Sequence, residues 1–294
     1  MGTRDRGYIY AAVAILLWAT VASAFKIALR HLDFLQLVFY ASAVSMAFFF
    51  AVLLVQGRLG VFKTYSKGDY LRSMVLGFLN PFLYYVALFQ AYSLLPAQEA
   101  QTLNYTWPIM IVLLSIPILK QRIGIKSVFA IVLSFSGVLI TSTEGDIFRL
   151  RFTNLSGVLL ALSSAVIWAL FWIYHLKDKR DDVARLCLNF AFGLVYIWIS
   201  LMFFSTPIVP DINGLLAAAY VGLFEMGLTF LLWLRALSLS TTTAQVSHFV
   251  YVVPFLSLII IHLIVGERIL VSTIIGLLLV VLGILLQRSA RASS

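Results

Sequence analysis

Apolar residues run along the chain in continuous blocks of about twenty, the length that a helix needs to cross the hydrocarbon of a bilayer. Strands of a membrane β-barrel would instead alternate between apolar and polar residues. Stretches such as AVSMAFFFAVLLV and IIGLLLVVLGILL show no alternation. The pattern therefore predicts an all-α polytopic membrane protein.

Polar interruptions divide the chain into ten predicted transmembrane helices. The helices are expected at residues 8–29, 34–55, 70–93, 98–119, 126–142, 155–175, 184–204, 213–237, 243–265 and 269–287. The first block has a competing interpretation, because Arg4, Arg6, an apolar run and Ala22-Ser23-Ala24 resemble a secretory signal with its cleavage site. The length of that run and the blocks that follow it favour a retained helix.

Positive charge is distributed unevenly around these helices. The chain carries 21 Lys and Arg against 12 Asp and Glu, a formal charge of +9. Sixteen of the 21 basic residues fall on the side of the N-terminus and five on the other. Basic residues are retained on the cytoplasmic side of a membrane. We therefore expect both termini in the cytoplasm and the protein in a prokaryotic plasma (inner) membrane.

Composition excludes several other classes of protein. With 62% hydrophobic and 11% charged residues, the chain has too few charges for a water-soluble surface. Cys187 is the single cysteine, which excludes an internal disulfide and a cysteine-based metal site. The absence of a glycine-rich phosphate loop argues against an ATP-driven pump. We expect no cofactor, no metal and no nucleic-acid partner. The expected partners are the lipid bilayer and a small-molecule substrate, and the sequence is compatible with a monomer.

An internal repeat relates the two halves of the chain. At one offset the matched pairs are Pro108 with Pro254, Arg122 with Arg268, and Gly137 with Gly283. Near the start of each half, Ala11 matches Ala161 and Trp18 matches Trp168. Apolar helices resemble one another by chance, but proline, arginine and glycine at one register weaken that explanation. The repeat predicts two five-helix halves, 1–150 and 151–294, within one integrated transmembrane domain.

The odd number of helices in each half has a topological consequence. The second half must enter the membrane in the opposite sense to the first. Inverted repeats are the architecture of many secondary transporters, whose substrate site lies near the midplane between the halves. The repeat therefore favours a transporter that works by alternating access over an enzyme or a receptor.

Several motifs of the repeat also carry a family resemblance. Trp18 and Trp168 stand in the first helix of each half, and each fourth helix has a proline. That helix is followed by KQR at 120–122 or GER at 266–268, and then by a glycine-bearing fifth helix. This arrangement resembles the EamA type of the drug/metabolite transporter superfamily. The stretch NYTWP at 104–108 is further similar to the aromatic amino-acid exporter branch. The first half departs from the pattern with Gln121 where many members have glutamate, as the second half does at Glu267.

The resemblance implies an exporter of amino acids or related metabolites. It also implies a substrate cavity between the halves, lined by the first, third, fourth, sixth, eighth and ninth predicted helices. Substrates vary widely within the superfamily, so the resemblance constrains the solute only weakly.

Polar and aromatic residues inside the predicted helices mark the candidate substrate site, because unpaired polar groups are costly in hydrocarbon. The candidates are Trp18, Asn80, Tyr84, Tyr85, Gln101, Asn104, Tyr105, Trp107, Trp168, Gln245, His248 and Tyr251. Asn80 and Tyr84 are four residues apart and would share a helix face. Helix kinks are expected at Pro81, Pro108 and Pro254. The structural alternative for all of these residues is helix packing through interhelical hydrogen bonds.

Two titratable residues inside the predicted helices have more than one interpretation. Glu225 lies near the centre of the eighth helix, between Gly222 and Gly227. It is either a proton-coupling site or partner of a substrate amine, or a neutral acid that bonds a neighbouring helix. His248 either bonds across helices or relays a proton, and the lack of a second histidine at ligand spacing favours the former.

The aromatic candidates predict a preference for aromatic or bulky neutral amino acids, which stack on Tyr84, Tyr105, Trp107 and Trp168. One alternative is an uncoupled facilitator of another metabolite or a drug-like solute. A membrane-embedded enzyme is less favoured, because Glu225 and His248 alone make a poor catalytic cluster.

Overall fold

The computed structural model describes residues 3–120, 124–148, 152–175, 177–207, 209–239 and 248–292. Every regular element within these ranges is helical. The long elements are α1 (Thr3–Ala28), α2 (Phe34–Val55), α3 (Lys67–Gly77), α4 (Tyr84–Leu94), α5 (Ala97–Asn104), α6 (Trp107–Leu119), α7 (Ile125–Ser142), α8 (Leu155–His175), α9 (Asp182–Phe204), α10 (Ile212–Tyr220), α11 (Leu228–Leu239), α13 (Val253–Val265) and α14 (Val271–Ala292). Short helical segments are η1 (Leu59–Thr64), η2 (Phe78–Leu83), η3 (Val221–Gly227) and η4 (His248–Val252).

Seven helices in the described part of the chain are long and apolar enough to cross a membrane. Two of them are composite, because Lys67–Leu94 joins α3, η2 and α4, and Ile212–Ala236 joins α10, η3 and most of α11. The predicted helix at 98–119 is broken between α5 and α6, and the one at 243–265 begins outside the described residues. The all-helical class is confirmed, and the count of ten stays a prediction.

Both composite helices contain a π-helical segment in their middle. In η2 the backbone of Asn80 is extended, with φ −147° and ψ 118°, immediately before Pro81. Pro81 has no N–H to donate within the helix, which favours such a break. The expectation that Asn80 shares a regular helix face with Tyr84 is therefore wrong. In η3 the segment carries Glu225, and π-segments inside α-helices are frequent at functional sites.

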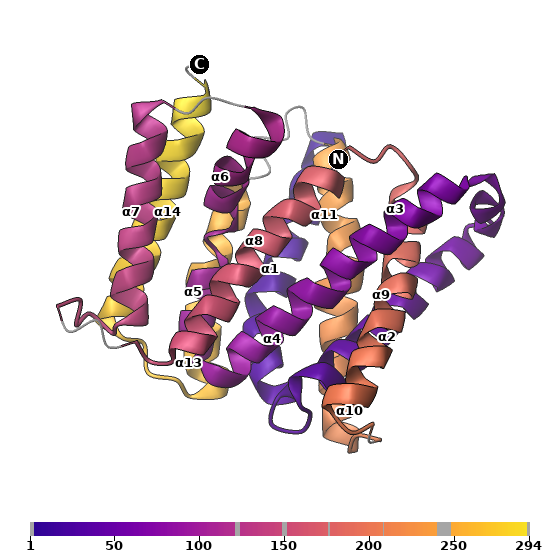
Figure 1. The fold of residues 1–294 in the computed structure, drawn as a ribbon, viewed down its shortest axis with the longest axis horizontal. Coiled ribbons are helices and arrows are strands. Elements are labelled where there is room, and N and C mark those ends of the chain that lie inside the picture. The colour runs from indigo at the N-terminus through magenta and orange to yellow at the C-terminus, as the bar shows by residue number, and fades with distance from the viewer. Residues whose placement is uncertain are drawn as a thin grey trace.

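The helices form a single bundle in which α7 and α14 stand as a pair at one end (Figure 1). Glycine allows their close approach, because a Cβ on Gly137 would lie 2.4 Å from the carbonyl oxygen of Gly276. Toward the other end, α2 packs along α9. Between them, α1 contacts α11 and α13, and α4 contacts α8. Small residues at such contacts are the usual device for packing membrane helices, where burial away from water gives no driving force.

The turn between α4 and α5 is held by two charged side chains from distant parts of the chain. Lys26 Nζ donates to the carbonyls of Tyr92 and Leu95, each at 2.8 Å. The Glu267 carboxylate accepts from the backbone N–H of Ala97 at 2.8 Å and of Gln98 at 3.3 Å. A cation at a helix C-terminus and an anion at a helix N-terminus each complement unsatisfied backbone groups and the helix dipole. We call this the Lys26–Glu267 junction.

Charged residues gather at the two ends of the bundle. Arg58 pairs with Asp181, which joins the loops before α3 and before α9. Nearby, burial raises the pKa of the Asp178 carboxyl, but its hydrogen bonds with Arg180 outweigh burial and leave that pKa below its usual range. His31 lies 3.0 Å from Asp211 at the ends of α1 and α10. These pairs show which loops share an end of the molecule.

Candidate functional site

A cavity of about 500 Å³ lies inside the bundle, between α1, α4, α5, α6, α8, η3, α11, η4, α13 and α14. This volume falls in the range of ligand pockets, which run from ~300 to 1,000 Å³. Its wall contains most of the residues expected from the sequence: Trp18, Tyr84, Gln101, Asn104, Tyr105, Trp107, Pro108, Trp168, Glu225 and Tyr251.

The remaining candidates lie elsewhere. Asn80 is buried in η2, away from the cavity wall, and within the described part of the chain its side-chain amide has no hydrogen-bond partner. Tyr85 is behind the wall and donates its hydroxyl to Glu225. Pro81 in η2 and Pro254 in α13 are not among the residues of the cavity wall. Gln245 and the side chain of His248 lie outside the described residues.

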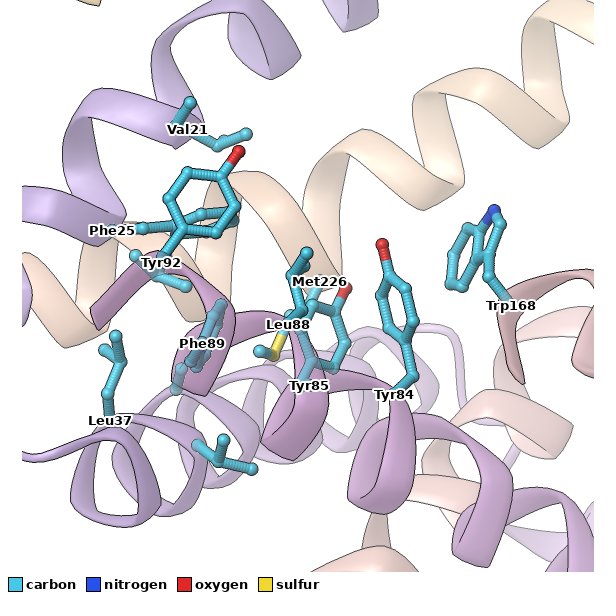
Figure 2. Close-up of a cluster of buried hydrophobic side chains, with 14 of the residues drawn as sticks. Val21, Phe25, Leu37, Tyr84, Tyr85, Leu88, Phe89, Tyr92, Trp168 and Met226 are labelled. Atoms are coloured by element: carbon cyan, nitrogen blue, oxygen red, sulfur yellow. The ribbon is translucent and has the colours of Figure 1, made fainter. Parts of the chain in front are cut away.

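Stacked aromatic rings form one side of the cavity. The rings of Tyr84 and Trp168 stack at 4.5 Å with an interplanar angle of 29°, and Figure 2 shows them side by side. The Phe230 ring meets Trp168 edge-on at 5.7 Å and also contacts Trp18 at 6.5 Å. The two tryptophans that match in the sequence repeat thus face one aromatic ring on α11.

The break between α5 and α6 brings a second group of side chains to the cavity. Helix α5 ends at Asn104, and α6 starts at Trp107 with Pro108 as its second residue. Proline suits the first turn of a helix, where its missing N–H is not needed. Pro254 likewise occupies the first turn of α13. Pro108 thus begins α6 after the turn at 105–106, and Pro254 begins α13 directly after the short helical segment η4, so the two expected kinks are helix starts. Because the chain turns here, Asn104, Tyr105 and Trp107 all reach the wall.

Asn104 is fixed by a contact with the second half of the chain. Its amide Nδ2 donates to Ser164 Oγ on α8 at 2.9 Å. Ser164 in turn donates to the carbonyl of Ala161 at 2.7 Å, within its own helix. The side chain is therefore held in one orientation at the cavity wall.

Glu225 is the acid in the described part of the wall. Only 8% of the residue is exposed, and Tyr85 OH donates to Oε1 at 3.3 Å. A buried carboxylate in a membrane protein is costly unless it is paired, wetted or protonated. Its position on a cavity gives it access to water or to a bound solute, which a purely packed acid would lack.

The structure also places in the wall several residues that the sequence analysis did not single out. The main ones are Phe230, Trp233, Tyr92 and Gln287. Phe230 and Trp233 are three residues apart on α11, which puts them on one helix face. Gln287 is the first polar residue after the apolar run of α14, directly before Arg288, and the sequence alone assigned it to the polar end of that helix. Tyr92 sits in an ordinary apolar context and carried no distinguishing signal.

A bundle of apolar, membrane-length helices around an aromatic cavity defines an integral membrane protein that binds a small molecule. The chain belongs to the EamA-like transporter family, whose sequence pattern matches residues 5–143 and 155–288. The resemblance noted in the sequence is therefore confirmed, and the protein is a membrane transporter of the drug/metabolite type.

Curated relatives are named as transporters, and one solved structure shares the fold. An uncharacterized transporter from Archaeoglobus fulgidus is 24% identical, over 96% of this chain and 97% of the relative. The aromatic amino acid exporter YddG from Ancylobacter novellus is 25% identical, over 79% of each chain. A solved structure titled "Crystal structure of protein" is 20% identical with a TM-score of 0.66, and the match covers 99% of each chain, which shows a common fold.

Proposed function

We propose that this protein is a secondary transporter that exports aromatic or bulky neutral amino acids and related metabolites through the central cavity. The observation that carries the proposal is the aromatic wall built by Trp18, Tyr84, Tyr105, Trp107 and Trp168. Aromatic faces favour planar, apolar solutes through offset or edge-to-face contacts. The relative from Ancylobacter novellus, named an aromatic amino acid exporter, supports the same class of substrate.

The proposed mechanism is alternating access between two inverted halves, 1–150 and 151–294. The family pattern matches the chain twice, once in each half. The α7–α14 contact supports the symmetry. A Cβ on Gly137 would meet the carbonyl of Gly276, and a Cβ on Gly283 would meet the carbonyl of Ala130. The two contacts are exchanged by the repeat, since 137 and 283, like 130 and 276, differ by the same 146 positions as Pro108 and Pro254.

A second pair of contacts follows the same symmetry on the other side of the bundle. A Cβ on Gly77, just before η2, would lie 2.3 Å from the carbonyl oxygen of Asn189 on α9. A Cβ on Gly222, in η3, would lie 2.3 Å from the carbonyl oxygen of Ala41 on α2. Each composite helix thus packs against the second helix of the opposite half. Such reciprocal packing is expected of inverted-repeat transporters.

The proposed orientation places both termini in the cytoplasm. The Arg58–Asp181 pair joins two loops that carry much of the basic excess. His31 and Asp211 join loops assigned to the opposite side. The grouping of loops in the structure thus agrees with the grouping that the positive-inside rule requires.

Counterflow into proteoliposomes tests the proposal. Purified protein is reconstituted in vesicles loaded with unlabelled solute, and uptake of labelled tryptophan, phenylalanine, leucine and glycine is followed. We expect uptake of the aromatic and bulky amino acids well above protein-free vesicles, and little uptake of glycine. Equal uptake of glycine and tryptophan would contradict an aromatic-lined site.

An uncoupled facilitator is the alternative function, and it applies if Glu225 has only a structural role. Flux that is indifferent to a pH gradient would favour it, and flux accelerated by the gradient would favour proton coupling.

A further inference from the structure

The described cavity wall carries ionisable groups of one sign, since it has an acid and no base. Within the described part of the wall, Glu225 is the ionisable acid, and the wall there contains no lysine, arginine or histidine. Lys26, which follows the wall residue Phe25 in the chain, is bound to the carbonyls of Tyr92 and Leu95. Electrostatic interactions are strong in a site with little water, so a lone carboxylate there distinguishes sharply between cations and anions.

The aromatic rings next to Glu225 reinforce this preference. Tyr85 holds Glu225 by a hydrogen bond, and its ring lies 4.7 Å from that of Tyr84. Tyr84 in turn stacks on Trp168. Figure 2 shows these three rings in sequence, with Tyr85 beside Met226, the residue after Glu225. The face of an aromatic ring is the negative part of its quadrupole and attracts ammonium groups.

The unpaired acceptor in the wall also favours a solute that donates hydrogen bonds. Gln101 Oε1 is buried, has no hydrogen-bond partner among the described residues, and can accept a bond from an ammonium N–H. Trp172 Nε1 is a buried donor that has no partner among the described residues. The donors of the described wall are neutral, and neutral N–H and O–H groups stabilise a buried carboxylate less than an arginine or a lysine does.

A free amino acid therefore meets a wall suited to only one of its two charged groups. Its ammonium group finds Glu225, Gln101 and the aromatic faces. Its carboxylate finds no cation in the described wall and is repelled by Glu225. Building on the proposed function, we propose that the cavity selects aromatic amines without a carboxylate over aromatic amino acids, with Glu225 as the specificity-determining residue.

Equilibrium binding to the purified full-length protein tests this proposal with three solutes that share one aromatic body. Phenethylamine carries only the ammonium, phenylalanine carries both charges, and hydrocinnamate carries only the carboxylate. We expect phenethylamine to bind at least roughly tenfold more tightly than either of the others, as the loss of a buried charge partner implies. Glu225→Gln should reduce the advantage of the amine over phenylalanine. Glu99→Gln changes a buried acid outside the cavity wall and should preserve it.

The result that overturns the proposal is phenylalanine binding as tightly as phenethylamine, or an undiminished amine preference in a folded Glu225→Gln variant. Should that variant fail to fold, phenylalanine amide compared with phenylalanine on the unchanged protein decides the question, because the amide keeps the amine and lacks the carboxylate. Counterflow separates the two proposals. Transport of phenylalanine without any amine preference leaves the proposed function standing, whereas transport of none of these solutes rejects both.

Discussion

Trp168 is the side chain with the most aromatic neighbours at the cavity, since it contacts Tyr84, Phe171, Trp172 and Phe230. Trp168→Ala removes the ring on which an aromatic solute would stack. We expect the half-saturation concentration for such a solute to rise by about tenfold, which corresponds to ~1.4 kcal/mol. Trp198→Ala is the control, because Trp198 on α9 is 46% exposed and absent from the cavity wall. Concentration-dependent uptake with unchanged kinetics in Trp168→Ala would reject an aromatic-lined site.

Substitution of Glu225 tests whether protonation of this acid is coupled to transport. Glu225→Gln keeps the size and the hydrogen bonding of the side chain but cannot change protonation. If the proton drives transport through this residue, the variant should still exchange solute and lose its acceleration by a pH gradient. Among the described residues, the titratable groups that interact with Glu225 include the phenols of Tyr84, Tyr85, Tyr92 and Tyr105, which do not supply a second carboxylate. Uptake with and without an imposed gradient measures the effect, and full gradient-driven uptake by the variant would rule out coupling at Glu225.

Single residues also show what the sequence was able to predict of the site. Trp18, Trp168, Asn104 and Glu225 stood out because polar or matched aromatic residues are unusual in a membrane helix, and the structure places them in the cavity wall. Asn80 had the same signal and lies away from it. Periodicity assumes a regular helix, and the extended backbone before Pro81 rotates Asn80 away from the Tyr84 face.

At the scale of elements, the α7–α14 pair depends on glycine. A Cβ on Gly137 would lie 2.4 Å from a backbone oxygen of the facing helix, and backbone cannot move aside as a flexible side chain can. We expect Gly137→Ala to lower the free energy of unfolding by about 1–3 kcal/mol, the usual cost of overpacking. Gly124→Ala, at the start of α7, is the matched control because nothing lies within 4 Å of its Cβ position. Thermal unfolding in detergent compares the two, and equal melting temperatures would contradict close packing at Gly137.

Element boundaries were the part of the fold least open to prediction from the sequence. Apolar blocks located α2, α7, α8 and α9 closely, because membrane thickness sets their length. At 105–106 the sequence analysis predicted only a kink at Pro108 within one helix, whereas the structure has a break between α5 and α6. The helix breaks there because Pro108 begins a new helix and the neighbouring side chains turn toward the cavity. The cavity is a feature of the tertiary structure, which hydropathy does not predict.

For the whole molecule, the orientation in the membrane is open to direct test. Single cysteines are introduced into a Cys187→Ala background, since Cys187 is the native thiol and is buried. An impermeant maleimide added to intact cells should modify Ser93→Cys and Asn213→Cys, and leave Lys63→Cys and Lys179→Cys unmodified until the cells are opened. All four positions are exposed in the structure, so accessibility differs only through the membrane. Modification of the latter pair in intact cells would invert or reject the proposed topology.

The Lys26–Glu267 junction has a consequence for the speed of the transport cycle. In the proposed alternating-access cycle, opening the cavity past α4 and α5 on that side would break two hydrogen bonds from an ammonium group and two to a carboxylate. Charge-assisted hydrogen bonds are about twice as strong as neutral ones, so they raise the activation barrier for opening this end. The sequence of the first half has Gln121 at the position matching Glu267 and therefore lacks the corresponding carboxylate. If the protein works by the proposed alternating access between two inverted halves, its two opposite movements are then expected to run at unequal rates, with solute departure through the Lys26–Glu267 side as the slower one.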